Sequence, residues 1–223
     1  MASVRKTRLI LASASPRRAE ILRDAGFDFE VRPCAVDESL RPGESPAAHV
    51  ERLAREKAVA AAGMEGTGII IAADTVVVAN RKILGKPASR ADARRMLRAL
   101  SGRTHQVLTG IAILKLFQPP GMNSKRRVGF LSSAVETTRV TFARLNRREI
   151  EEYVASGEPH DKAGAYAVQG RGGRFVTRIE GCYFNVVGLP LAHLSRMLSD
   201  METQQGGSKH KQRSGAPRRH KRN

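Results

Sequence analysis

The chain has 223 residues, of which 39 are Lys or Arg and 21 are Asp or Glu, so its formal net charge is +18. Hydrophobic residues make up 41% of it, which is enough to bury a core and excludes a globally disordered protein. No apolar run approaches the roughly 18 residues of a membrane-spanning helix, and the run near the N-terminus is too short for a secretory leader. Two cysteines are too few for a disulfide framework, so we expect a cytoplasmic protein with reduced thiols and no membrane contact.

Strand and helix patterns alternate along the chain. Apolar runs bounded by turn residues predict strands over residues 8–12, 27–36, 68–79, 82–84, 106–116, 135–145 and 184–187. Apolar residues at helical spacing, several of them after a Ser or Asn cap, predict helices over residues 16–26, 46–63, 89–102, 149–155 and 189–201. The alternation predicts one α/β domain, residues 1–202, with a mixed sheet, flanking helices and two lobes around a cleft.

Two basic segments lie outside these elements. Residues 203–223 hold seven basic residues, no acidic one and no apolar residue larger than Pro, so we expect a disordered tail. A second basic run lies in the loop at 118–128. Basic runs of this kind bind nucleic acid weakly by releasing counterions, and the chain has no RNA-binding or helix-turn-helix signature. We expect at most weak, non-specific nucleic-acid contact through the tail.

One acidic residue interrupts the most apolar predicted strand. Asp74 lies within the run IIIAADTVVV, where an unpaired buried charge costs several kcal/mol. It could pair with a core-facing Lys, or it could bind Mg²⁺ or orient a water. Lys57, on an Ala-rich helix face, could pair with Asp74 or with a substrate phosphate. Glu38 and Lys86 are further candidate companions.

Polar residues also gather at the first strand-to-helix junction, at Ser13, Ser15, Arg17 and Arg18. A helix N-terminus presents free N–H groups, and arginines add bidentate phosphate donors, so the junction favours a phosphate site. The opposite interpretation is that these are ordinary surface arginines.

A third candidate is the Gly-rich segment DKAGAYAVQG at 161–170, which contains Lys162 and Gln169. Small residues let the backbone approach a ligand closely, and the Gln169 amide can both donate to and accept from a base edge. The segment could equally be a plain Gly-rich loop.

Together, in this order, these motifs resemble the Maf family of nucleoside triphosphate pyrophosphatases from about Arg8 to Met201. The resemblance rests on LILASASPRR at 9–18, REKA at 55–58, ADT at 73–75, GKP at 85–87, SGRTHQV at 101–107, DKAGAY at 161–166 and VGLP at 187–190. It implies a mixed α/β fold similar to the inosine triphosphate pyrophosphatases. It also implies hydrolysis of a nucleoside triphosphate to the monophosphate and pyrophosphate with a divalent metal.

Within the family, the chain resembles the branch that acts on dTTP and UTP, because it has the Arg pair directly after Pro16, Thr75 after Asp74, and Gln169. The resemblance implies that Asp74 is the proton acceptor. It places specificity positions at Arg17, Thr75 and Gln169. It places other cleft positions at Ser13, Arg18, Glu38, Lys57, Lys86 and Lys162.

Charge predicts how such a site would work. A triphosphate carries about four negative charges, which Arg17, Arg18, Lys57 and Lys86 would neutralise. Mg²⁺ prefers hard oxygen ligands, so Glu38 and Asp74 are its expected ligands, with Mn²⁺ as the second candidate.

Other functions remain open at this point. The domain could be a scaffold for a nucleic-acid-binding tail, or it could regulate septum formation, the phenotype for which the family was named. The family also suggests a homodimer, and a house-cleaning role against pyrimidine nucleotides with altered bases is a further hypothesis.

Overall fold

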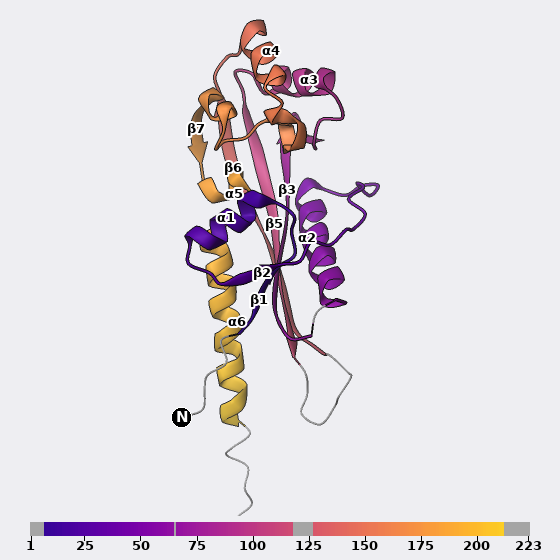
Figure 1. Ribbon diagram of the computed structural model, residues 1–223, viewed down its shortest axis with the longest axis vertical. Helices are drawn as coiled ribbons and strands as arrows, with labels where there is room; N and C mark the ends of the chain where they lie inside the picture. The colour runs from indigo at the N-terminus through magenta and orange to yellow at the C-terminus, as the bar shows by residue number, and fades with distance from the viewer. Residues whose placement is uncertain (1–6, 65, 118–126, 212–223) are drawn as a thin grey trace, which may run out of the picture.

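Figure 1 shows the computed structural model of the chain, which describes residues 7–64, 66–117 and 127–211. The elements in chain order are β1 Leu9–Leu11, α1 Pro16–Asp24, β2 Phe29–Val31, α2 Pro46–Ala62, β3 Gly68–Ala79, β4 Lys82–Leu84, α3 Arg90–Leu100, β5 Thr104–Phe117, β6 Arg127–Phe142, α4 Arg147–Ala155, the short 3-10 turns η1 Glu158–Asp161, η2 Ala163–Ala165 and η3 Arg171–Phe175, β7 Val176–Glu180, α5 Tyr183–Val187 and α6 Leu191–Lys211.

The strands form one mixed sheet in the order β2-β1-β3-β5-β6-β7, with β4 paired to β3. β1 runs parallel to β2 and β3, whereas the remaining pairings are antiparallel. β5 and β6 pair with each other across the segment between them. The mixed sheet with flanking helices confirms the predicted fold class.

Helices cover the two faces of the sheet differently (Figure 1). Along β3, Ile70 and Ala72 pack with Ala54 and Ala58 of α2 on one face. The alternate residues of β3 pack on the other face with apolar side chains of α1, α5 and α6. Side chains alternate across a strand, so consecutive residues of β3 face different helices.

α2 approaches β5 closely, and a glycine permits this. A Cβ on Gly110 would lie 2.2 Å from the carbonyl oxygen of Val50, so any larger residue would push the helix away. Gly110 pairs with Asp74 in the register of the two central strands. The close approach therefore places α2 directly beside Asp74.

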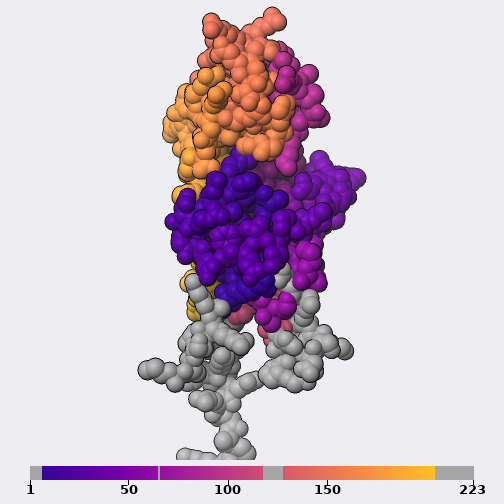
Figure 2. All heavy atoms as spheres, in the orientation of Figure 1, coloured from indigo at the N-terminus to yellow at the C-terminus, as the bar shows by residue number. Residues whose placement is uncertain are grey.

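A second apolar cluster lies at the opposite end of β3, β5 and β6. Its buried residues come from α3, α4 and the η turns, and include Leu97, Tyr153 and Phe175. We call this part, with β7, the upper lobe, and the part with β1, β2, α1, α2 and α6 the lower lobe. In the space-filling view the indigo N-terminal segment lies directly below the orange part of the upper lobe (Figure 2).

The five predicted helices begin within two residues of their predicted starts. Ser45 caps α2 and Ser89 caps α3, each accepting a backbone N–H with its side-chain oxygen. Asn146 and Glu149 form a reciprocal capping box at the start of α4. Ser15 occupies the cap position of α1 but makes no side-chain capping bond there.

Two strand predictions were wrong. Residues 184–187, predicted as a strand, belong to helix α5, and the strand in this region is β7 at Val176–Glu180. The buried amide of Asn185 donates to the Val107 carbonyl and the Thr138 hydroxyl, which holds the segment as a helical turn against β5 and β6. β2 is also shorter than the predicted 27–36, since its last bond is from the Arg32 N–H and Pro33 has none to continue the ladder.

The C-terminal helix extends past its predicted end. α6 continues from the expected terminus at Met201 to Lys211, so the first part of the segment expected to be a disordered tail is helical. The rest of that tail, and residues 118–126 of the basic loop, lie outside the described residues. Nucleic-acid contact through the tail therefore stays a prediction. Within the described ranges, no helix is both long and apolar enough to cross a membrane.

Candidate active site

A cleft of about 580 Å³ lies where the two lobes meet, lined by residues from both. Nine of the ten residues predicted from the sequence line it: Ser13, Arg17, Arg18, Glu38, Lys57, Asp74, Thr75, Lys86 and Lys162. They come from six separate places in the chain, and the fold brings them together.

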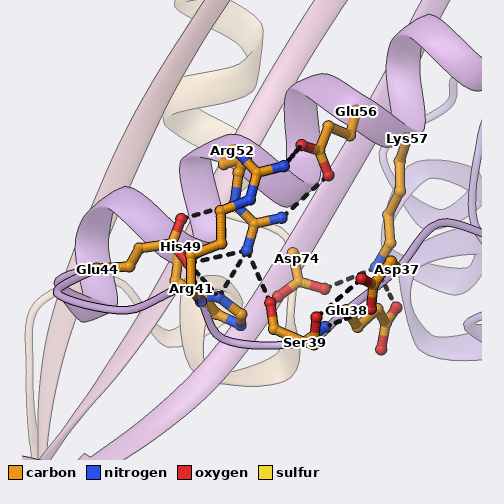
Figure 3. A network of polar contacts seen from close by, with 10 residues as sticks. All are labelled: Asp37, Glu38, Ser39, Arg41, Glu44, His49, Arg52, Glu56, Lys57 and Asp74. Carbon is orange, nitrogen blue, oxygen red and sulfur yellow. Dashed lines mark hydrogen bonds and ion pairs between the residues drawn. The ribbon is translucent and has the colours of Figure 1, made fainter.

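On the α2 side of β3, one ammonium joins two carboxylates. Nζ of Lys57 lies 2.7 Å from Oδ1 of Asp74 and 2.6 Å from Oε1 of Glu38. Lys57 and Asp74 are both buried, each 8% exposed, whereas Glu38 reaches in from the loop between β2 and α2. Figure 3 shows the three side chains converging. The ion pair explains how Asp74 is tolerated in a core strand.

The charges of this cluster act on Glu38. Partial burial alone would raise the pKa of the Glu38 carboxyl. The hydrogen bond from Lys57 and the positive charges of Lys57, Lys86 and Arg18 outweigh it, and they hold that pKa below its ordinary value. Glu38 is therefore a carboxylate at neutral pH, and it faces the cleft with Asp74.

On the α1 side of β3, the site residues form hydrogen bonds and not ion pairs with one another. The Arg18 guanidinium donates to the hydroxyls of Ser13 and Thr75, each at 3.1 Å, and to the carbonyl of Gly188 at 2.8 Å. Thr75 is also bonded to the hydroxyl of Thr109 at 2.9 Å. Burial lowers the pKa of Arg18, and the nearby Asp74 carboxylate opposes that shift. Three of the five N–H groups of Arg18 thus hold the cleft wall, and two remain for a ligand.

The remaining cations of the cleft differ in whether their N–H donors are already bonded within the protein. Lys162 is paired with the neighbouring Asp161. Arg17 and Lys86 line the cleft but form no hydrogen bond or ion pair with the part of the chain that the structure describes. Among the described residues of the cleft lining, Arg17 and Lys86 therefore have all their donors available to an anion, whereas Arg18 has two.

Gln169 is the predicted residue that the structure does not bring to the cleft lining. It is exposed on the turn that follows Tyr166, and Tyr166 does line the cleft. The specificity role predicted for Gln169 stays a prediction.

The carboxylates fit a hard divalent cation. Glu38 and Asp74 each place a carboxylate oxygen within 2.7 Å of the Lys57 nitrogen, so the two carboxylates lie close together at the cleft. Mg²⁺ in proteins is bound by one or two carboxylates, with waters and substrate phosphates completing the octahedron. Among the described residues there is no group of three or more His, Cys, Asp or Glu suited to a metal.

Sequence reasoning missed several lining residues, among them Cys34, His49 and Asp161. Cys34 donates to the carbonyl of Lys57 at 3.1 Å, and burial raises the pKa of its thiol. Cys34 and Cys182 are both free, as expected. The spacing of His49 and Lys57, eight residues apart on one face of α2, was the available signal for His49.

Comparison with known proteins found a family model and relatives that match most of this chain. A family model described as Maf-like protein matches residues 8–201. The dTTP/UTP pyrophosphatase of Anaeromyxobacter dehalogenans is 50% identical over 191 residues, which cover 86% of this chain and 92% of that protein. The dTTP/UTP pyrophosphatase of Vibrio cholerae is 48% identical over 193 residues, 86% of this chain and 97% of that protein. Among solved structures, the Staphylococcus aureus Ham1 protein matches with a TM-score of 0.39 and 18% identity, over 61% of this chain and 72% of that one.

Proposed function

The chain belongs to the Maf-like protein family, and we propose that its cleft hydrolyses dTTP and UTP to the monophosphate and pyrophosphate. The relatives that share about half of its residues over nearly their full length are named for this activity. The observation that supports the assignment most directly is the cleft itself. It sets two carboxylates around one ammonium, beside two cations, Arg17 and Lys86, that form no ion pair with a described residue.

The cations would bind and neutralise the triphosphate. Arg17 and Lys86 have free donors toward the cleft, and Arg18 keeps two N–H groups beyond those that hold the wall. Positive groups aimed at the phosphates lower the cost of bringing a nucleophile to an anionic centre, and they stabilise the charge of the leaving pyrophosphate.

Asp74 would accept the proton of the attacking water. One of its oxygens is bonded to Lys57, while the other makes no bond with a described residue and can orient a water. Water attacks the α-phosphorus, the bond from that phosphorus to the bridging oxygen breaks, and the water's proton passes to Asp74. Lys57 keeps the carboxylate in place through its hydrogen bond to the other oxygen.

Glu38 and Asp74 would hold a divalent cation, with Mg²⁺ preferred and Mn²⁺ second. When bound, such a cation polarises phosphate oxygens and adds positive charge beside the reacting phosphorus. The protein's own part is to keep the two carboxylates close together, which the shared ammonium of Lys57 does.

Selection of the pyrimidine would involve Arg17, Thr75 and Gln169. The Thr75 hydroxyl is already bonded to Arg18 and Thr109, so we propose that it acts by orienting Arg18. The Gln169 amide would read the edge of uracil or thymine from the turn after Tyr166. Cytosine exchanges hydrogen-bond donor and acceptor at the ring nitrogen and at the exocyclic group beside it, so it should fit less well.

The test is a pyrophosphate-release assay with dTTP, UTP, CTP, 7-methyl-GTP and base-modified pyrimidine triphosphates, each with Mg²⁺ or Mn²⁺. We expect release from dTTP and UTP well above release from CTP and 7-methyl-GTP. Release from none of the panel contradicts the proposal. Deletion of residues 212–223 is expected to leave hydrolysis unchanged, which separates the enzyme from a nucleic-acid-binding function of the tail.

A further inference from the structure

The loop between β2 and α2, residues 32–45, supplies one of the two cleft carboxylates without regular secondary structure of its own. The Glu38 side chain is 57% exposed, yet its carboxylate lies 2.6 Å from the buried ammonium of Lys57. Holding an exposed glutamate in one place costs backbone and side-chain entropy. Something else in the structure must therefore fix this loop.

A second ion-pair cluster joins the loop to α2, and the chemistry proposed for the cleft does not use it (Figure 3). Arg52 of α2 donates to both carboxylate oxygens of Glu44, at 2.6 and 2.8 Å, in a bidentate pair. The two side chains are only 13% and 9% exposed. His49 lies 3.0 Å from the same carboxylate. The hydrogen bonds from Arg52 hold the pKa of Glu44 far below its ordinary range, so the pair stays charged.

The same guanidinium reaches the residue next to Glu38. Nη2 of Arg52 donates to the carbonyl oxygen of Ser39 at 3.0 Å. Ser39 is in turn bonded through its N–H and its hydroxyl to the Asp37 carboxylate, at 2.9 and 2.8 Å. The backbone on both sides of Glu38 is therefore tied into one hydrogen-bonded turn, and Arg52 anchors that turn to α2.

Lys57 stands on the same helix as Arg52, and Glu56 between them strengthens the anchor. Glu56 accepts from Arg52 at 3.0 Å and from Arg41 of the loop at 2.8 Å. α2 is itself fixed, because its small apolar residues pack on β3 and Val50 lies against Gly110. One rigid helix thus presents both the ammonium that receives Glu38 and the arginine that holds its loop.

We propose that Arg52, paired with Glu44, is a positioning residue that holds the 37–44 loop on α2 so that Glu38 stands beside Lys57 and Asp74 in the cleft. The kinetic test of this proposal rests on the proposed function, whereas the hydrogen-exchange test of the loop does not. Arg52 itself is absent from the binding and proton-transfer steps, and it acts through Glu38.

A double-mutant cycle separates this role from a merely structural one. The variants are Arg52→Met, Glu38→Gln and the pair together, measured for kcat, KM and the Mg²⁺ concentration at half-maximal rate. Loss of a partner that orients a metal-binding carboxylate lowers activity or metal affinity about 10- to 100-fold. We expect such a loss for each single variant, and the double variant should match Glu38→Gln within about twofold. If the two losses multiply instead, Arg52 does not act through Glu38 and the proposal is wrong.

Hydrogen exchange supplies a readout that is independent of catalysis. In Arg52→Met, the amides of residues 37–44 should exchange at least about tenfold faster, while those of β3 stay protected. Arg148→Met is the matched control, because Arg148 pairs with Glu152 on the outer face of α4 with its side chain 88% exposed. It should change neither exchange nor kcat. Unchanged loop exchange in Arg52→Met would overturn the proposal.

Milder variants cover a failure of Arg52→Met to fold. Arg52→Lys keeps the charge but loses the bidentate fork, and Glu44→Gln keeps the size but loses the charge. Each should fall between wild type and Arg52→Met in both loop exchange and Mg²⁺ requirement. Wild-type values from both, in folded protein, contradict the inference. Failure of the proposed function looks different, since wild-type protein would then release no pyrophosphate while the exchange pattern of the loop still responded to Arg52.

Discussion

Asp74 and Thr75 are neighbours on β3, yet the two sides of the strand meet different chemistry. Asp74 faces α2 and forms charge pairs, joined by Lys57 to Glu38. Thr75 faces α1 and forms hydrogen bonds with Arg18 and Thr109. A strand that alternates its side chains can thus place an acid–metal site and a phosphate-binding wall at one point of the chain. From this comparison we propose that the α2 side carries the reaction and the α1 side holds the substrate.

Asp74→Asn tests the α2 side and has the largest expected effect. The amide cannot accept the water's proton, so kcat should fall by about 10² to 10⁴, the contribution of a general base. Lys57 keeps its pair with Glu38, so the variant should remain folded in a urea titration. A folded Asp74→Asn protein with wild-type turnover would remove the proposed distinction between the two sides.

Thr75→Val tests the α1 side by replacing a hydroxyl with a methyl of the same shape. The change leaves Arg18 and Thr109 each short of one partner, which costs about 1 to 3 kcal/mol in the free energy of unfolding. We expect KM for the nucleotide to rise by about tenfold while kcat changes little, because Arg18 loses orientation but the base remains. Steady-state kinetics and urea unfolding check both. A kcat loss as large as that of Asp74→Asn contradicts the assignment.

The ionisation of Glu38 has the smallest expected effect, a local change in stability with pH. Despite partial burial, Lys57 and its neighbours lower the pKa of Glu38 from 4.5. A carboxyl whose pKa is lower in the folded protein adds stability above its unfolded pKa, and this is lost as the pH falls through the folded value. The stability that Glu38 contributes on the α2 side should therefore be lost on acidification below about pH 4.5.

NMR of the Glu38 carboxyl carbon measures this directly. Wild type should titrate below 4.5, Lys57→Met should titrate higher, and Thr75→Val should match wild type. A Glu38 pKa that is unaffected by Lys57→Met would show that the ammonium does not control this carboxylate.

Local sequence signals identified much of the site. A single Asp in an apolar strand needs a partner, and a Pro-Arg-Arg turn at a helix start favours a phosphate site, so Asp74, Arg17 and Arg18 stood out as candidates. The sequence left two partners open for Lys57, Asp74 or a phosphate. The structure gives Asp74, and adds Glu38 as a second partner.

The Arg52–Glu44 pair was not predicted. The two residues lie eight apart, one on a helix and one in a loop, and no periodicity links them. The helix at 183–187 was mistaken for a strand for a similar reason, since the buried bonds of Asn185 to β5 and β6 outweigh the strand preference of Phe and Val.

The sequence alone determined most of the strands and helices, apart from β7 and α5, and most of the charged residues of the cleft, because periodicity, caps and misplaced charges are local properties. Tertiary structure decided which charges meet. It divided Asp74 and Thr75 between two helices, used three donors of Arg18 to hold the cleft wall, and fixed the Glu38 loop through Arg52. Ion pairs and hydrogen bonds act only over a few ångströms, so their partners are set by how the elements pack and not by distance along the chain.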